Sequence, residues 1–414
     1  MASVCLFFEV HQPLRLNWFD TSNTYVSDYK QLIDKYFNMG LNKYVFDKVA
    51  NRCYFPTNRI ILELLDKFKS EKKKFKVSYG ISGVWIEQCE KFNKDLLDTF
   101  KQLADTGCVE FVDNTYYHSL SSLFDINRTE FIEQVKMHSE LMKDLFGQRP
   151  TFFENTEFIY NNLIAKTVEG LGYKGMFTEG VDWILGWRSP DYVYKPKFCD
   201  KLKLLLRNYR ISDDIGYRFS SRDFDQWPIT AEKYAAWLAA NPGQCVNICI
   251  DYETFGEHHW AESGIFWFLK ALPYQVLKYD NLEFCTPTEI VEKYQPVGEI
   301  DVFEYNTISW ADMERDTSAW ISNKMQQVCY NEVKSLEKYV KATGDRDLLH
   351  IWRLLQISDH YYYLCTKWWG DGDVHHYFSH IKNPYEGFIN FLTIISDFKS
   401  RVMEELMKKN ITVK

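Results

Sequence analysis

The chain has 414 residues, of which 46% are hydrophobic and 26% charged, and its formal net charge is −8 at pH 7. A chain of this length can bury a large core, so we expect one large catalytic domain with an accessory domain rather than several small modules. The acidic balance argues against a nucleic-acid partner, because phosphate binding needs concentrated Lys and Arg. There is no apolar window of about 18 residues and no N-terminal secretory pattern, so we expect a cytoplasmic protein without a membrane partner.

Aromatic residues are frequent, at 17% of the chain. Aromatic rings fill cores and also stack on sugar faces in clefts, and we expect both roles here, with most rings in the core. The ten cysteines are scattered, and only Cys245 and Cys249 lie close together in sequence. Several fall in apolar, strand-like runs, so we expect free buried thiols rather than disulfides or a zinc framework.

Short apolar runs alternate with longer polar stretches of helical length as far as residue 287. This alternation is typical of βαβ units and predicts a parallel sheet. The predicted strands are residues 3–10, 75–82, 108–114, 151–157, 174–179, 201–208, 245–253 and 282–287. They indicate an α/β fold of the incomplete, TIM-like (β/α)7 type, in which we expect the strand at 201–208 to belong to an excursion from the barrel.

The alternation stops near residue 297, and the rest of the chain has a helical pattern. Apolar residues recur near a 3.6-residue period in three stretches, 318–340, 346–365 and 385–409. We therefore predict a catalytic barrel domain over residues 1–297 and a C-terminal helical domain over residues 298–414.

The second helical stretch carries an unusual mixture of side chains. Trp352, Gln356, Asp359, His360 and Tyr363 are spaced as one face of a continuous helix. A face that mixes aromatic rings with amide, carboxylate and imidazole groups suits an apolar core poorly. We expect it to line the substrate cleft, so that the helical domain completes the active site; a structural polar network between the domains is the alternative.

Polar side chains recur where the predicted strands end. His11 follows the first strand, His118 follows the third, Glu157 ends the fourth and Asp251 ends the apolar run VNICI in the seventh. The carboxyl ends of barrel strands meet at one rim, where barrel enzymes carry their reactive groups. Each of these residues alone is often structural, but their gathering on one rim predicts an active site.

Two carboxylates among His, Trp and Tyr residues favour glycosidic bond cleavage. One carboxylate attacks the anomeric carbon or activates water, and the other, kept protonated by its surroundings, protonates the departing oxygen. Glu157 and Asp251 suit these roles. We expect Glu157 to face the barrel axis, and Glu154 to fall on the other face of the strand because side-chain direction alternates.

Five sequence blocks occur in an order that is typical of a known family. They are FEVHQP at 8–13, CVEFVDNTYYHSL at 108–120, TFFENTEFIYNN at 151–162, CIDYETFGEHH at 249–259 and WRLLQISDHYYYL at 352–364. With these blocks the chain resembles glycoside hydrolase family 57, in its α-amylase-like branch. The resemblance implies a (β/α)7 barrel, a helical region that helps to close the site, and a retaining mechanism on α-1,4-glucans or maltooligosaccharides, without a cofactor or a metal.

The resemblance also implies roles for individual residues. Glu157 matches the nucleophile and Asp251 the general acid/base. The positions that match other parts of the blocks, and that we assign to substrate binding, are His11, Glu110, His118, Glu253, Trp352, Asp359 and His360. Three further stretches look like this branch, and within them Asp214, Trp310 and Asp373 are candidates either for substrate contact or for a structural role.

Three alternatives remain open. A 4-α-glucanotransferase would use the same two carboxylates with a sugar acceptor in place of water. A metal-dependent polysaccharide deacetylase would use His11, His118, Asp251 and His258 as ligands, although the last would have to be presented by a loop. A non-catalytic glucan-binding protein would keep the aromatic cleft without turnover, but the presence of both carboxylates favours an enzyme. The sequence predicts no oligomeric state.

Overall fold

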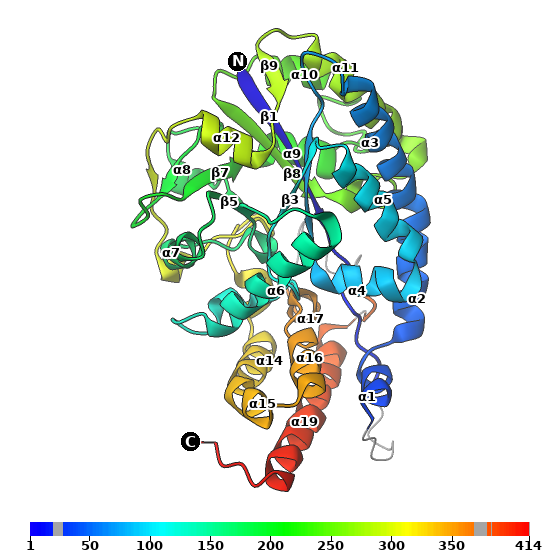
Figure 1. Cartoon of the computed structure of the whole chain (residues 1–414), viewed down its shortest axis with the longest axis vertical. Helices are drawn as coiled ribbons and strands as arrows, with labels where there is room; N and C mark the ends of the chain where they lie inside the picture. The colour runs from blue at the N-terminus through cyan, green and yellow to red at the C-terminus, as the bar shows by residue number, and fades with distance from the viewer. Residues whose placement is uncertain (20–27, 368–378, 382, 414) are drawn as a thin grey trace.

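The computed structural model describes residues 1–19, 28–367, 379–381 and 383–413. Seven parallel strands form a barrel in the neighbour order β3-β2-β1-β8-β7-β5-β4, with helices around it (Figure 1). These strands are β1 (Ala2–Val10), β2 (Val77–Ile81), β3 (Val109–Val112), β4 (Phe152–Phe153), β5 (Gly175–Glu179), β7 (Lys203–Arg207) and β8 (Cys245–Asp251). The predicted (β/α)7 barrel is confirmed.

A single β-bridge nearly closes the barrel between β3 and β4, the two strands at the ends of the neighbour order. The amide of Asp113, just beyond β3, donates to the Phe152 carbonyl at 2.9 Å, and the amide of Glu154 donates to the Asp113 carbonyl at 2.8 Å. Because β4 has only two residues, this edge of the barrel is held by few backbone hydrogen bonds.

The expectation that residues 201–208 lie outside the barrel is wrong. β7 lies between β5 and β8, and it meets β8 through Arg207 opposite Asn247. Its basic residue Lys203 is accommodated because the ammonium donates to the carbonyls of Val291 and Tyr294, at the C-terminal end of a neighbouring helix. The strand outside the barrel path is instead β9 (Leu282–Phe284), which pairs with the first residues of β1.

Helices cover the outside of the barrel, and all nine residues of β1 are buried, as expected for a strand that is covered on both faces. Aromatic rings fill the barrel interior, with Phe7 packing on Phe158 and Phe177. All ten cysteines are free and buried, as predicted. The helices between the strands are α1 (Tyr29–Tyr36), α2 (Met39–Val49), α3 (Phe55–Phe68), α4 (Gly83–Phe92), α5 (Lys94–Asp105), α6 (Thr129–Phe146), α7 (Asn162–Gly170), α8 (Asp182–Leu185), α9 (Tyr209–Gly216), α10 (Ala231–Ala239), α11 (Ile265–Leu277) and α12 (Pro287–Lys293).

The C-terminal part of the chain is helical, as predicted, and its helices gather at one end of the molecule, below the barrel in Figure 1. They are α13 (Ser318–Ile321), α14 (Lys324–Ser335), α15 (Glu337–Thr343), α16 (Arg346–Leu354), α17 (Ser358–Tyr362) and α19 (Pro384–Lys408). Between the barrel and these helices, β10 (Glu299–Ile300) pairs with β6 (Lys195–Pro196) in a small separate sheet. Among the described residues, no helix combines the length and the apolar character that crossing a bilayer requires.

The predicted continuous helix through residues 352–363 is wrong. The chain leaves helical geometry between α16 and α17, where Ile357 is extended and forms a bridge with Ser119 of the barrel. Five residues that would share one face of a continuous helix therefore do not share one face in the structure.

Candidate active site

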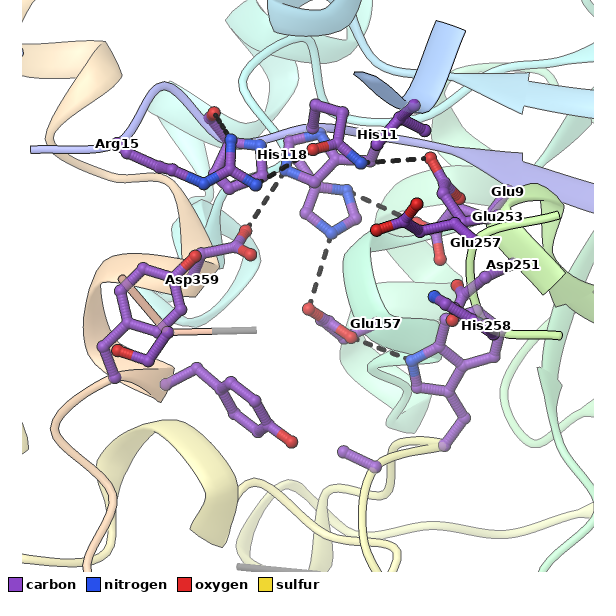
Figure 2. Close-up of a pocket in the computed structure, with 18 of the residues that line it drawn as sticks. Glu9, His11, Arg15, His118, Glu157, Asp251, Glu253, Glu257, His258 and Asp359 are labelled. Carbon is purple, nitrogen blue, oxygen red and sulfur yellow. Dashed lines mark hydrogen bonds and ion pairs between the residues drawn. The ribbon is translucent and has the colours of Figure 1, made fainter. Parts of the chain in front are cut away.

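A cavity of about 720 Å³ lies between the carboxyl ends of the barrel strands and the C-terminal part of the chain (Figure 2). This volume lies within the usual range for small-molecule sites. The barrel contributes charged side chains to its wall, among them Glu9, His11, His118, Glu157, Asp251 and Glu253. The C-terminal part contributes aromatic and charged side chains, among them Trp310, Arg315, Asp359, Tyr362 and Tyr363. The helical region therefore forms part of the wall.

Glu157 sits on a short turn, η3 (Thr156–Phe158), that follows β4. Its backbone is left-handed, with φ 59° and ψ 23°, a conformation that costs a residue with a Cβ on the order of 1–3 kcal/mol. The carboxyl group is held on both sides: the indole Nε1 of Trp310 donates to Oε2 at 2.8 Å, and the hydroxyl of Ser358 donates to Oε1 at 3.1 Å. A strained residue that is fixed by two donors indicates a functional role.

The expected alternation of side chains between Glu154 and Glu157 does not apply, because β4 ends at Phe153. Glu154 is fully buried, and its Oε2 lies close to Gly80 of the barrel strand β2. Burial and the nearby charge of Glu157 raise the pKa of Glu154 well above its usual range. Both carboxyl groups therefore belong to one acidic cluster, in which Glu157 faces the cavity and Glu154 is sealed from it.

Asp251 ends strand β8 and faces the same cavity. Burial, reinforced by the negative charge of Glu157, raises its pKa to about 7, although Arg207 and His118 oppose the shift. A carboxyl group that keeps its proton near neutral pH can serve as a general acid.

Glu253 follows two residues later and is also buried. It accepts hydrogen bonds from the Tyr54 hydroxyl and, at 3.4 Å, from Nε2 of Gln12. Burial and the neighbouring Asp251 raise the pKa of Glu253 to about 8, so this group is mostly protonated at neutral pH. A protonated carboxyl can donate to a sugar hydroxyl as well as accept from it.

His11 and Asp359 join the barrel to the helical region. Nε2 of His11 lies 3.2 Å from Oδ2 of Asp359, and Nδ1 of His11 lies 2.7 Å from the Ser82 hydroxyl. Burial and the neighbouring His118 lower the pKa of His11 to about 4, so the ring is neutral at pH 7. Burial would raise the pKa of Asp359, but the contact with His11, together with the nearby His118 and His360, outweighs burial and lowers the pKa to about 2. The neutral ring therefore donates to an ionised carboxylate.

Within the described residues, His11, His118 and Asp359 bring three possible metal-ligand atoms within 4.8 Å of one another. The two imidazole rings, however, are stacked, with centroids 3.9 Å apart and planes inclined by 19°. Lone pairs that lie in nearly parallel planes do not converge on a tetrahedral ion. Asp251 and His258, which a deacetylase site would also require, are not part of this group. The geometry does not support the alternative metal site.

Three residues that the resemblance assigns to substrate binding lie away from the cavity. The Glu110 carboxylate accepts from the backbone N–H and the hydroxyl of Thr288, and so caps the first turn of α12. The indole of Trp352 is fully buried and donates to the Val333 carbonyl at 2.8 Å. The imidazole of His360 is buried beside the Leu354 carbonyl, at 3.1 Å. Their contacts are those of structural residues, and we no longer assign them to the substrate.

The remaining candidates also include residues that line the cavity and residues that do not. Trp310 lines the cavity, whereas Asp214 pairs with Arg218 at 2.7 Å and its neighbour Asp213 lines the cavity instead. Gln356 accepts from Gln134 at 2.9 Å, away from the cavity. Asp373 lies outside the described residues.

Sequence reasoning missed several cavity residues, including Glu9, Asp213, Tyr217, Arg315 and Tyr362. Glu9 did carry a signal, because a carboxyl group within an otherwise apolar buried strand is costly and points to a function. Arg315 carried none, because it follows no strand; only the fold brings it to Glu179, which it contacts at 2.8 Å.

Two carboxyl groups of contrasting environment at the rim of a parallel barrel are the arrangement that glycosidic bond cleavage requires. The family model described as "Glycosyl hydrolase family 57" matches residues 5–303. The chain belongs to this family. This membership argues against the hypothesis of a polysaccharide deacetylase.

Named relatives agree with this placement. A protein of Methanocaldococcus jannaschii that is assigned as an alpha-amylase is 49% identical over 97% of this chain and 85% of its own length. An alpha-amylase of Pyrococcus horikoshii is 22% identical over 61% of this chain, which spans only 39% of that relative.

Solved structures show the same fold. A GH57 branching enzyme from Thermococcus kodakaraensis has a TM-score of 0.66 at 14% identity, over 98% of this chain and 91% of that one. A 4-alpha-glucanotransferase from Thermococcus litoralis has a TM-score of 0.60 at 17% identity, over 87% of this chain and 56% of that one.

Proposed function

We propose that the protein is a retaining, α-amylase-like glycosidase that acts on α-1,4-glucans or maltooligosaccharides, with Glu157 as nucleophile and Asp251 as general acid/base. The observation that carries the proposal is the contrast between these two groups. Two neutral donors, from Trp310 and Ser358, stabilise a carboxylate at Glu157. Burial keeps Asp251 largely protonated, with a pKa of about 7. The group that is held by hydrogen-bond donors suits the role of nucleophile, and the group that keeps its proton suits the role of acid.

The proposed reaction has two steps. In the first, a Glu157 oxygen forms a bond to the anomeric carbon while Asp251 gives its proton to the departing glycosidic oxygen. In the second, the Asp251 carboxylate takes a proton from water, whose oxygen attacks the same carbon and releases Glu157. The sugar leaves with its original anomeric configuration, and both residues return to their starting states.

The remaining cavity groups suit the recognition of a neutral, hydroxyl-rich ligand. We assign substrate binding to His11, Glu253 and Asp359, which combine an ionised acceptor with neutral donors. His118 lies beside them in the cavity wall, with its ring nitrogens toward Glu9 and Glu157. The rings of Trp310, Tyr362 and Tyr363 provide apolar surfaces for sugar faces on the other side of the cavity. The named relatives support α-glucans as the substrate class, since they include alpha-amylases.

A 4-α-glucanotransferase activity is the second candidate. The aromatic wall from the C-terminal part of the chain would hold an acceptor sugar and exclude water, which favours transfer over hydrolysis. Similar proteins named as a 4-alpha-glucanotransferase and a branching enzyme support this candidate.

Incubation with maltoheptaose, followed by chromatography of the products, tests both candidates. Shorter products alone mean hydrolysis, and shorter plus longer products mean transfer. Glu157→Gln should lower turnover by more than about 10³-fold, because an amide cannot form the glycosyl-enzyme. No activity of the wild-type protein on any α-glucan, or an active Glu157→Gln variant, would refute the proposal.

Glu87→Gln is the matched control for this experiment. Glu87 is a partly buried carboxyl group, with a pKa raised to about 7 by burial, and it accepts from the Tyr116 hydroxyl at 2.9 Å. It does not line the cavity. We expect this variant to keep turnover within about threefold of the wild-type value, because the substitution changes no group of the cavity.

A further inference from the structure

His118 lies between two carboxyl groups that belong to different parts of the site. Its Nδ1 is 3.4 Å from Oε1 of Glu9, and its Nε2 is 3.5 Å from Oε1 of Glu157 (Figure 2). Glu9 and His118 are each only 3% exposed. Each ring nitrogen of His118 therefore faces one carboxyl group.

The backbone holds the His118 ring in this position. The residue has a left-handed φ of 47°, and its amide donates to the Thr115 carbonyl at 3.0 Å. Its carbonyl accepts from the Ser358 amide at 3.0 Å, and its ring stacks on His11. These backbone hydrogen bonds and the ring contact hold His118 beside the two carboxyl groups.

Glu9 has little besides His118 to balance a negative charge. Its Oε1 and the Nδ1 of His118 are both buried, and neither atom forms a hydrogen bond with any described residue. After burial, the largest influences on Glu9 come from four acidic groups, namely Glu154, Glu157, Asp251 and Glu253. Burial and this repulsion raise the pKa of Glu9 well above its usual range. A proton placed between Oε1 of Glu9 and Nδ1 of His118, which lie 3.4 Å apart, would satisfy both of these buried atoms.

Either position of that proton has the same effect on Glu157. A protonated Glu9 donates to Nδ1 of a neutral ring, whose own proton must then reside on Nε2. If the shared proton moves to the ring, Nδ1 and Nε2 both carry protons. In both arrangements an N–H group faces the Glu157 carboxylate.

We infer that Glu9 is a positioning residue, which acts through His118 to hold the Nε2–H of that ring toward the Glu157 carboxylate. The inference rests on the proposed role of Glu157 as nucleophile. The neutral His11 and the ionised Asp359 also lie beside the ring, and His11 lies within hydrogen-bond distance of Asp359.

Nitrogen-15 NMR of the histidine side chains tests the proton arrangement without relying on activity. The signal of His118 is identified among the ten histidines by its loss in His118→Gln. We expect a protonated Nε2 in the wild-type protein and in Glu9→Gln, whose amide can still donate to Nδ1. We expect a mixture of tautomers in Glu9→Met, which offers no donor. A wild-type ring with a proton on Nδ1 alone would overturn the inference, and this measurement needs no variant at position 9.

Kinetics test the link to catalysis. Glu9→Met should lower kcat by about tenfold or more with KM within about twofold, whereas Glu9→Gln should stay within about threefold of the wild-type kcat. The double variant Glu9→Met/His118→Gln should be no slower than His118→Gln alone, because Glu9 acts through His118. Losses that simply multiply would indicate that Glu9 only fills the barrel, and would overturn the inference. Failure of the proposed function appears separately, as an active Glu157→Gln variant.

Discussion

The indole Nε1 of Trp310 donates a hydrogen bond of 2.8 Å to Oε2 of Glu157, so a residue beyond the last barrel helix fixes a carboxylate that the barrel supplies. The backbone strengthens the same link, because the Trp310 amide donates to the Glu157 carbonyl at 3.1 Å. Two segments that are separated by 153 positions in sequence thus together fix one carboxyl group at the cavity.

Trp310→Phe should reduce activity through loss of the indole donor. A hydrogen bond to a charged group is worth about 1.5–3 kcal/mol, so we expect kcat to fall by about 10- to 100-fold while KM changes little. Steady-state kinetics on maltoheptaose measure the effect. Trp352→Phe is the matched control: it also loses an indole donor, but to the Val333 carbonyl away from the cavity. It should lower the melting temperature and leave kcat nearly unchanged, and equal kinetic losses in the two variants would contradict the assignment.

Asp251→Asn should distinguish substrates by their leaving groups. Without the acid, cleavage of maltooligosaccharides should slow by about 10²- to 10⁴-fold, because the departing oxygen needs a proton. Aryl α-maltosides with acidic phenol leaving groups need little protonation and should lose much less of the first step. Rates on a series of aryl maltosides measure the difference, and a uniform loss across the series would show that Asp251 is not the acid.

The pH dependence of activity follows from the same residue. Because Asp251 must be protonated to act as an acid and its pKa is raised to about 7, kcat/KM for maltooligosaccharides should fall as the pH rises above about 7. In Asp251→Asn this alkaline decline should disappear from the residual activity. A wild-type profile that stays flat to pH 9 would be inconsistent with the raised pKa.

The raised pKa of Asp251 also predicts the sign of a stability change. The folded state holds this proton more tightly than the unfolded state does, so the free energy of unfolding should decrease as the pH rises from about 4 through about 7. Asp251→Asn removes this contribution and should stabilise the protein at pH 8 by up to about 4 kcal/mol, because the pKa is raised from 3.8 to about 7 and each pKa unit corresponds to about 1.4 kcal/mol. Urea denaturation of both proteins at pH 5 and pH 8 measures the difference, which should be small at the lower pH.

Asp359→Asn should show that the helical region takes part in the site. The change removes the charge that His11 contacts at 3.2 Å, and we expect kcat/KM to fall by about tenfold or more. Asp397→Asn is the control, because Asp397 pairs with Arg401 at 2.7 Å on α19 and lies outside the cavity. We expect Asp397→Asn to reduce the stability of the protein and to leave kcat/KM nearly unchanged. Comparable kinetic effects of the two changes would mean that Asp359 has only a structural role.

Several features could be predicted from the sequence because they depend on local patterns. Apolar runs separated by helical stretches predicted the barrel, since a strand that is buried on both faces, such as β1, must be apolar throughout. The rim position of His11, His118, Glu157 and Asp251 followed from the rule that parallel strands end at one edge. The ordered blocks identified the family.

Other features depended on contacts between distant segments, which local patterns do not encode. The break at Ile357 arises because this residue pairs with Ser119, and it separates Asp359 in the cavity from Trp352 in the core. β4 ends at Phe153 and Glu157 lies on a left-handed turn beyond it, so strand alternation could not place Glu154. The raised pKa of Asp251 comes from burial and from the charge of Glu157, 94 positions away in the chain, and only the tertiary structure brings these two groups together.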